Sequence, residues 1–188
     1  MTVSTASAVW EGGLKSGKGT FAAKSGAFKG PYTFATRFEG AEGTNPEELL
    51  AAAHAACFSM ALSAGLEKAG TPVTRVQTTA SCTMDMVDGG RKITTMRLVT
   101  RAKVAGVDQA AFLKAAEAAR DGCPVSGAFK GNVKVELDAT LEGRRSSCPK
   151  RFIAPIAPSR SPGVRGMWAC TRRGNSGSSA TVRSAGRK

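Results

Sequence analysis

A histidine and a cysteine stand close together in an apolar stretch of the chain. His54 precedes Cys57 by three positions, a spacing that places two side chains on roughly one face of a helix. A Cys–His pair can work as an activated nucleophile, as it does in cysteine proteases. No third group that would orient the histidine is evident in the sequence, and no protease signature surrounds the cysteine. A core cysteine beside a satisfied histidine is the plainer interpretation, and the spacing leaves both open.

A second cysteine stands where a short helix is predicted to start. Pro124 suits the first position of a helix, which would make Cys123 the residue that caps it. At that place the free N–H groups and the positive end of the helix dipole lower the pKa of a thiol. Cys123 is therefore a candidate reactive thiol, and a buried turn cysteine is the alternative.

Cys57 needs a nearby cation if it is to react as a thiolate. Burial raises the pKa of a thiol, and the dipole at the start of its own helix fades within the first turn. Arg37 is the candidate, because its guanidinium stays charged and offers a planar fork of donors. An exposed arginine at the end of a strand is the plainer interpretation of Arg37.

The cysteine count argues against a framework of disulfides and against structural zinc. The five cysteines are Cys57, Cys82, Cys123, Cys148 and Cys170. An odd number cannot all pair, none lies in a CxxC motif, and His54 is the single histidine, so we expect no metal site. Cys82 lies inside a predicted strand and is expected to be structural, and the two last cysteines are assigned no role.

The elements that must position these residues begin with three short strands and a long helix. Alternating apolar runs and glycine turns predict strands at residues 2–10, 19–24 and 32–38. Asn45 as the cap, Pro46 at the first position and Glu48 in a capping box then predict a helix start.

The helix that follows has an unusual surface. Its apolar run covers residues 49–66 and is apolar on nearly every face, which predicts a central helix that is buried on most sides. Gly70 and Pro72 end it.

The second half of the domain contains two long strands, two helices and a last strand. The predicted strands cover residues 73–87 and 92–104, around a turn at Asp88-Gly89-Gly90, and a closing strand covers residues 132–141. Asp108 caps a helix at residues 109–120, and a short helix follows at residues 125–129. The order βββ-α-ββ-α-β indicates an α+β fold.

The net charge of +13 belongs to the end of the chain. Residues 1–143 hold 16 basic and 14 acidic side chains, whereas residues 144–188 hold 11 basic side chains and no acidic one. We expect residues 1–143 to form one domain and residues 144–188 to form a disordered basic tail. The tail makes nucleic-acid binding an alternative function, although it has few aromatic side chains and no recognised binding motif.

We expect a cytoplasmic protein with no membrane contact. The sequence has no run of eighteen apolar residues, and residues 1–13 have no basic segment and no long apolar segment of a secretory signal.

Three segments together resemble a known family. They are Thr36-Arg37-Phe38-Glu39-Gly40, the run from Gly43-Thr44-Asn45-Pro46-Glu47 into Ala53-His54-Ala55-Ala56-Cys57-Phe58, and Gly122-Cys123-Pro124-Val125-Ser126. Their combination and order resemble the OsmC/Ohr family (osmotically inducible protein C and organic hydroperoxide resistance proteins), and the OsmC branch most closely. The resemblance covers about residues 7–141.

The resemblance implies a redox enzyme. It implies that Cys57 is the peroxidatic cysteine, that Cys123 is the resolving cysteine, and that Arg37 and Glu47 form a charged pair that tunes Cys57. The implied substrate is an organic hydroperoxide, the implied reductant is an external dithiol of lipoyl type, and no cofactor or metal is required. Phe58 and Met60 are expected to line an apolar substrate pocket. A fold relative that binds a ligand without catalysis is the alternative.

The implied fold has antiparallel β-sheets around a buried central helix, with a second helix, in an intertwined homodimer. Glu47 precedes Cys57 by ten positions, which on a straight helix is a rise of roughly 15 Å. If both serve one site, either the helix breaks or Glu47 comes from a partner chain, and the second possibility agrees with sites at a subunit interface.

Overall fold

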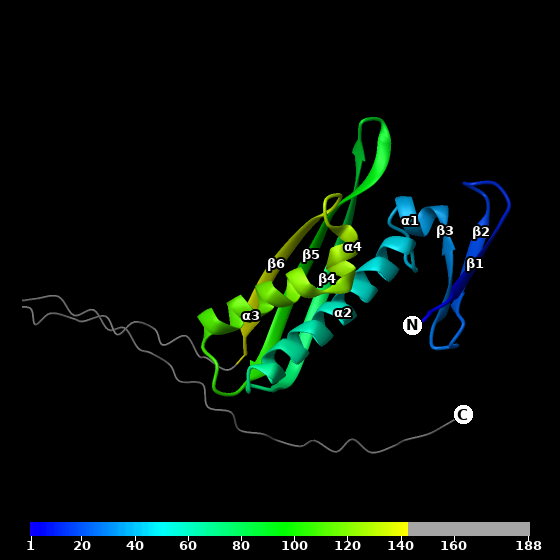
Figure 1. Ribbon diagram of the computed structural model, residues 1–188. Helices are drawn as coiled ribbons and strands as arrows, with labels where there is room; N and C mark the ends of the chain where they lie inside the picture. The colour runs from blue at the N-terminus through cyan, green and yellow to red at the C-terminus, as the bar shows by residue number, and fades with distance from the viewer. Residues whose placement is uncertain (143–188) are drawn as a thin grey trace, which may run out of the picture. The chain divides into compact units, whose positions relative to one another are not determined.

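The structure is a computed structural model, and it describes residues 1–142 (Figure 1). The tail predicted at residues 144–188, its expected disorder and its possible nucleic-acid binding lie outside the described residues.

The first three strands form one antiparallel sheet. They are β1 (Ala6–Glu11), β2 (Lys18–Ala23) and β3 (Lys29–Thr33), paired in the order β1-β2-β3. Gly19 lies opposite Trp10 on one side and Tyr32 on the other. A Cβ atom at Gly19 would overlap the Tyr32 ring, which explains a glycine in the middle of a strand. The strand predicted at residues 19–24 is confirmed to within one residue, whereas β1 begins at Ala6, four residues after the start of the strand predicted at residues 2–10.

The strand predicted at residues 32–38 is wrong. β3 ends at Thr33, and a short helix, α1 (Phe34–Phe38), follows at once. Thr33 Oγ1 accepts a hydrogen bond from the Thr36 N–H at 3.1 Å, and the Thr33 N–H donates to Thr36 Oγ1 at 3.0 Å. This reciprocal cap starts a helix despite the β propensity of the segment.

The long helix is confirmed as α2 (Pro46–Lys68). Asn45 Oδ1 accepts a hydrogen bond from the Glu48 N–H at 2.8 Å, and Pro46 occupies the first turn. Within this first turn, the Glu48 carboxylate does not bond back to Asn45, so the predicted capping box is only half formed.

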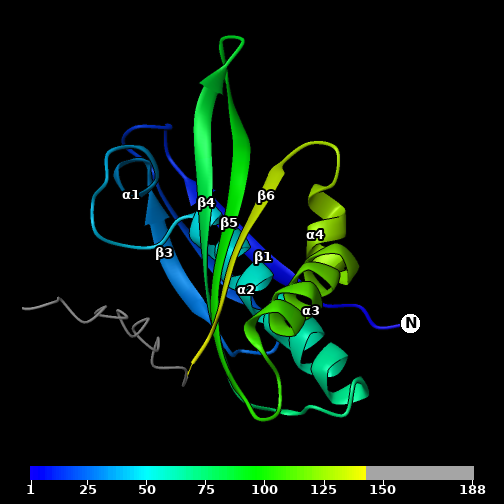
Figure 2. The ribbon, with the colours of Figure 1, turned by 90° about the vertical axis from the view of Figure 1, so that its left-hand side faces the viewer.

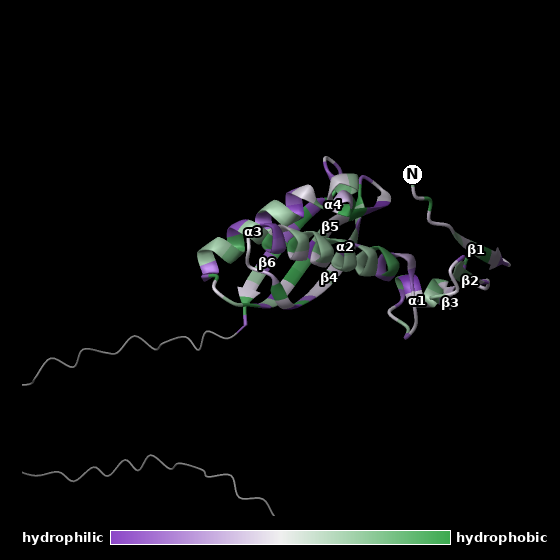
Figure 3. Cartoon of the chain, turned by 60° about the horizontal axis from the view of Figure 1, so that its bottom comes forward, coloured by the Kyte–Doolittle hydropathy of each residue, from purple (hydrophilic) through white to green (hydrophobic). Residues whose placement is uncertain are grey.

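The expectation that α2 is buried on most sides is wrong for a single chain. One stripe is buried, formed by His54, Phe58, Leu62 and Leu66 at intervals of four residues. The opposite stripe is exposed, formed by Ala52, Ala56, Met60 and Ala64. In Figure 3, most of α2 is coloured on the hydrophobic side of the scale. An apolar stripe of this length remains without cover inside residues 1–142.

Three further strands form a second sheet. They are β4 (Val73–Val87), β5 (Gly90–Val104) and β6 (Lys134–Leu141), in the order β4-β5-β6. Asp88 and Gly89 both adopt positive φ, at 52° and 76°, as the predicted tight turn requires. Alternate residues of β5 from Met96 to Ala102 are buried, so one face of this sheet belongs to the core.

The second sheet is mixed, which corrects the expectation of purely antiparallel sheets. β4 and β5 are antiparallel, whereas β5 and β6 are parallel. The connection from β5 to β6 contains α3 (Gln109–Gly122) and α4 (Pro124–Phe129), and a crossover of this length lets the chain return in the same direction. The α2, α3 and α4 helices lie on one face of the sheet (Figure 2).

The core joins α2 to this sheet and to α3. Its fully buried members include Phe58, Leu62, Leu98 and Phe112. Hydroxyl groups add a polar connection, because Ser59 Oγ donates to Thr78 Oγ1 at 2.8 Å next to the core. These contacts fix the position of the middle of α2, where Cys57 lies.

By length and composition, α2 also meets the criteria for a membrane-spanning helix, with a mean hydropathy of 1.7. Core helices pass the same test. This helix packs on β4, α3 and α4 and carries the buried Glu47 and His54. We therefore interpret it as a core helix with one unpaired face.

Candidate active site

The two candidate cysteines meet. Cys57 lies in the middle of α2 and Cys123 lies at the start of α4, 66 positions later, yet their Sγ atoms are 3.1 Å apart. Both are free thiols, and a disulfide needs about 2.05 Å, so the sulfurs need to approach by only about 1 Å more. Cys123 is buried, whereas Cys57 is partly exposed. The pair therefore has one sulfur that a substrate can reach and one that is held behind it.

The surroundings shift the pKa values of the two thiols in opposite directions. Burial raises the pKa of Cys57, and its contact with Cys123 raises it further, against a smaller effect of the Val125 N–H. Burial also acts to raise the pKa of Cys123, but hydrogen bonds from the Ser126 N–H, the Cys57 thiol, the Ser126 hydroxyl and the Val125 N–H together lower it. The 3.1 Å contact allows a proton on either sulfur, and these donors favour the thiolate of Cys123 over that of Cys57.

The predicted position of Cys123 at a helix start is confirmed. It is the N-cap residue of α4, and Pro124 occupies the first turn. The Cys123 side chain makes no N-cap hydrogen bond, but the nearby amides of Val125 and Ser126 help to lower the pKa of its thiol. A short helix of this kind presents free N–H groups at its start, and they favour a negative charge.

A buried histidine ties the two cysteine-bearing helices together. His54 is fully buried, and its Nε2 atom lies 2.8 Å from Ser126 Oγ. The ring also packs against Phe129, with 5.4 Å between ring centroids. His54 therefore fits the interpretation as a core histidine better than the interpretation as a base that activates Cys57. Its partner Ser126, three residues after Cys123, was not predicted.

Arg37 and Glu47 form a second polar centre. Arg37 Nη2 lies 2.7 Å from Glu47 Oε1, and Arg37 Nε lies 3.2 Å from both carboxylate oxygens. The Glu47 side chain is largely buried at 11% exposure, whereas that of Arg37 is 37% exposed. Asn45 Nδ2 donates to the Thr36 carbonyl at 3.3 Å, so the cap of α2 also holds α1 in place. Arg37 therefore lies on a short helix, not at the end of a strand.

Within one chain, the charged pair and the sulfur pair are separate. Helix α2 is unbroken from Pro46 to Lys68, so Glu47 and Cys57 are roughly 15 Å apart along its axis. Arg37 is paired with Glu47, so its guanidinium lies at the start of α2 and not beside Cys57. The cation that was expected beside Cys57 is therefore not supplied by the same chain.

Cys82 lies beside the charged pair. It lines a cavity of about 480 Å³ together with Arg37, Glu47 and Met84. Burial raises the pKa of Cys82, and the negative charge of Glu47 raises it further. An unactivated thiol is consistent with the structural role expected from the sequence.

The proposed substrate pocket is wrong as described. Phe58 is fully buried in the core of its own chain, whereas Met60 is 75% exposed on the opposite face of α2. Residues that are two positions apart on a helix are separated by about 200° around its axis, so the Phe58 and Met60 side chains cannot line one pocket of one chain.

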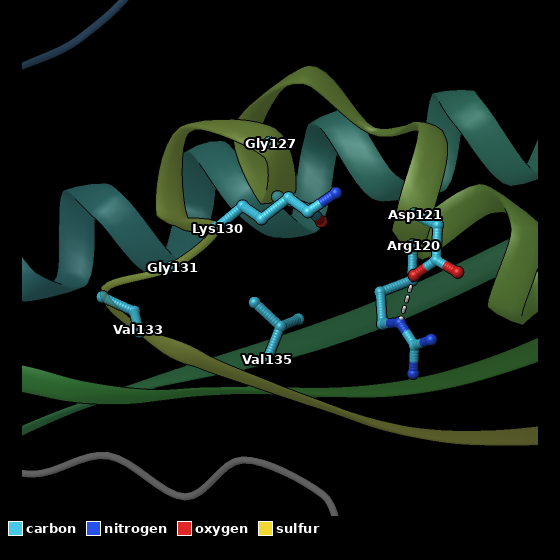
Figure 4. A pocket seen from close by; sticks show the side chains of 8 residues that line it. Arg120, Asp121, Gly127, Lys130, Gly131, Val133 and Val135 are labelled. Atoms are coloured by element: carbon cyan, nitrogen blue, oxygen red, sulfur yellow. Dashed lines mark hydrogen bonds and ion pairs between the residues drawn. The ribbon is translucent and has the colours of Figure 1, made fainter.

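A further cavity lies beside α4. It has a volume of about 430 Å³ and is lined by residues of α3, α4, β6 and the turn between α4 and β6, among them Arg120, Ser126 and Lys130. Figure 4 shows Arg120 paired with Asp121, at 2.9 Å, and the extended Lys130 side chain. Among residues 1–142, no three His, Cys, Asp or Glu side chains gather in a way that could hold a metal ion.

Comparison with known proteins decides the family. Residues 39–138 match the OsmC family model, described as "OsmC-like protein", and this segment contains both sulfurs and Glu47. The chain belongs to the OsmC family. The OsmC segments named from the sequence lie within or just before the matched range, so the resemblance is confirmed.

Relatives from both branches of the OsmC/Ohr family are similar to the chain. It is 48% identical to the peroxiredoxin OsmC of Escherichia coli K12 over 128 residues, which cover 68% of this chain and 90% of the relative. It is 38% identical to the organic hydroperoxide resistance protein OhrB of Bacillus subtilis over 101 residues, which cover 53% of this chain and 72% of the relative.

Solved structures support the same fold. The crystal structure of OhrB of Bacillus subtilis matches 72% of this chain and 97% of its own, with a TM-score of 0.59 and 29% identity. An organic hydroperoxide resistance protein OsmC of Legionella pneumophila matches 74% of this chain and 99% of its own, with a TM-score of 0.58 and 26% identity. The α+β fold of the OsmC family is therefore confirmed.

Proposed function

We propose that this protein is a thiol-dependent peroxidase that reduces organic hydroperoxides to alcohols. The observation that carries the proposal is the distance of 3.1 Å between two free sulfurs from different helices. The names of the relatives, a peroxiredoxin and organic hydroperoxide resistance proteins, support the substrate class.

In the first step, the thiolate of Cys57 attacks the distal oxygen of the hydroperoxide. The O–O bond breaks, the alkoxide takes a proton and leaves as the alcohol, and Cys57 becomes a sulfenic acid. Cys57 takes this role because it is the more exposed of the two sulfurs.

In the second step, the thiolate of Cys123 attacks the sulfur of the Cys57 sulfenic acid. The S–O bond breaks, hydroxide leaves and becomes water, and an intramolecular disulfide forms. The lowered pKa of Cys123 suits this role, because it supplies a thiolate next to the sulfenic acid.

An external dithiol then completes the cycle. One of its thiolates attacks the Cys57–Cys123 disulfide, and its second thiol releases the enzyme by forming the disulfide of the reductant. We propose a dithiol of lipoyl type, as the family resemblance implies. The overall change uses two electrons from the dithiol for each hydroperoxide.

We propose that a homodimer completes the site. The raised pKa of Cys57 disfavours the reactive thiolate, so a cation is needed beside it. The Arg37–Glu47 pair of a second chain is the available source, with Glu47 orienting the guanidinium. The uncovered apolar stripe of α2, which contains Met60, offers a surface for the second chain.

Turnover of an organic hydroperoxide with an added dithiol tests the proposal. The Cys57→Ser variant is expected to lose turnover. The Cys123→Ser variant is expected to complete one reduction per chain and then to accumulate overoxidised Cys57. The Cys82→Ser variant is the matched control and keeps turnover, because its sulfur contacts neither of the other two. Steady turnover in Cys57→Ser would defeat the assignment.

A further inference from the structure

His54 is buried between the two helices that carry the reacting sulfurs. It lies one turn before Cys57 on α2, and Ser126 lies three residues after Cys123 on α4. His54 Nε2 and Ser126 Oγ are 2.8 Å apart, although 72 positions separate them in the sequence. The Phe129 ring packs against the imidazole, which further fixes its orientation. The His54–Ser126 bond thus joins the two elements whose relative position sets the sulfur–sulfur distance.

The surroundings of His54 favour one tautomer. Burial lowers the pKa of His54, so the ring is neutral near pH 7 and carries one N–H. His54 Nδ1 is buried and has no hydrogen-bond partner among the described residues. A proton on Nδ1 would leave a buried donor unpaired, which is costly. A proton on Nε2 donates to Ser126 Oγ and leaves only a lone pair without a partner.

This tautomer also determines what Ser126 can do. When Ser126 Oγ accepts from His54, its own proton is free to be donated elsewhere. Ser126 lies in the first turn of the α4 helix that Cys123 caps, and its hydroxyl acts with the amides at the start of α4 to lower the pKa of the Cys123 thiol. With the opposite tautomer, the Ser126 hydroxyl would donate its proton to His54 Nε2, and this proton would no longer be available to the Cys123 sulfur.

We propose that His54 and Ser126 are positioning residues for the resolving step, forming a chain in which His54 Nε2–H donates to Ser126 Oγ and Ser126 Oγ–H donates to Cys123 Sγ. This inference rests on the proposed peroxidase function. The chain favours the thiolate of Cys123 and keeps its sulfur 3.1 Å from that of Cys57. It therefore determines whether a Cys57 sulfenic acid becomes a disulfide or reacts with a second hydroperoxide to give a sulfinic acid.

The balance of the two competing steps makes this role measurable. Attack by Cys123 forms the S–S bond and releases hydroxide, whereas attack of the Cys57 sulfenate on the distal oxygen of a second hydroperoxide breaks the O–O bond, adds an oxygen atom to the sulfur and releases another alcohol. Removing the Ser126 donor slows only the first of these reactions. We expect it to fall by about tenfold or more, the factor that one lost hydrogen bond to a charged group represents.

Nitrogen NMR of the untagged full chain tests the tautomer. His54 is the single histidine of the chain, so labelling histidine with ¹⁵N gives one ring only. We expect the spectrum at neutral pH to show a protonated Nε2 and an unprotonated Nδ1. A protonated Nδ1 would overturn the proposed chain, whatever the activity of the protein.

Three variants test the positioning role, with mass spectrometry of Cys57 after limited hydroperoxide as the readout. Ser126→Ala removes a single oxygen atom and is expected to shift the product from disulfide to sulfinic acid. His54→Gln keeps a donor near the position of Nε2 and is expected to restore most of the disulfide, whereas His54→Leu fills the space without a donor. An unchanged ratio in Ser126→Ala overturns the inference, even if His54→Leu fails to fold.

The two proposals fail in different ways. An unaltered chain that consumes no hydroperoxide defeats the proposed function, and the histidine spectrum still tests the hydrogen-bonded chain. A chain that turns over normally and gives the same product ratio in every variant leaves the peroxidase in place and removes the role of His54.

Discussion

Glu47 and Cys57 lie on one unbroken helix, ten residues apart, and each belongs to a different polar centre. Glu47 pairs with Arg37 at the start of α2, whereas Cys57 meets Cys123 near its middle. A rise of roughly 15 Å between them prevents the guanidinium of one chain from stabilising the thiolate of the same chain. A single chain therefore contains the redox pair and the charged pair without joining them, and we propose that a second chain brings the two together.

Mixed dimers test this arrangement. The Cys57→Ser and Arg37→Met variants are each expected to be inactive. After the two are refolded together, we expect about a quarter of the unaltered activity, because roughly half of randomly paired dimers are mixed and each mixed dimer has one intact site. Turnover of an organic hydroperoxide is the measurement.

The matched control is a mixture of Cys57→Ser with Cys123→Ser. Both sulfurs of a pair come from one chain, so this mixture should recover no steady turnover. If the Arg37→Met mixture also stays inactive while its dimers form, the charged pair does not act across chains.

The exposed stripe of α2 should control self-association. Met60→Lys places a charge on this apolar stripe, and we expect a folded monomer with little turnover, because a buried unpaired charge is costly in an interface. Sedimentation and circular dichroism measure the two properties.

Leu113→Lys is the control for Met60→Lys. Leu113 is an exposed apolar residue of α3, at 39% exposure, and its replacement should change neither association nor activity. A fully active monomer of Met60→Lys would show that the site is complete in one chain.

The stability of the protein should depend on His54 below pH 6.5. Burial lowers the pKa of His54 in the folded state from its ordinary value of 6.5, so the unfolded chain takes up the proton first as the pH falls. The contribution of His54 to the free energy of unfolding is complete above pH 6.5, and it is lost as the pH falls through the lowered pKa of the folded state. Chemical unfolding at fixed protein concentration measures it.

His54→Gln isolates this effect, because glutamine does not titrate. Its free energy of unfolding should stay flat between pH 6.5 and the carboxylate range, where Glu136 and Asp121 begin to titrate below their ordinary values of 4.5 and 3.8. Equal slopes in the two proteins above pH 5 would mean that His54 is not buried in a neutral state.

Removal of residues 144–188 should leave turnover unchanged. The four residues assigned to the reaction lie between positions 37 and 123, and the contacts that join them in pairs lie within residues 1–142. Salt-dependent binding of nucleic acid by the full chain, absent from the shortened one, would indicate a separate role for the basic segment. Loss of turnover in a folded shortened chain would tie that segment to the enzyme.

Local signals predicted most elements, because the physics that forms them is local. Asn45, Pro46 and Asp108 mark helix starts, and the positive φ of Asp88 and Gly89 forms the turn between the two long strands. The short helix after Thr33 was missed, since its cap depends on two threonines in a segment with β propensity.

The sequence by itself determined the candidate residues, the helix starts and the family. Only the tertiary structure decided which of those residues meet: Cys57 with Cys123, His54 with Ser126, and neither sulfur with the Arg37 of its own chain. Residue types and spacing along the chain govern propensity and capping, whereas contacts across dozens of positions arise when helices and strands pack to bury apolar surface. That packing places Ser126 near Cys123 and leaves Cys57 without the cation of Arg37 beside it.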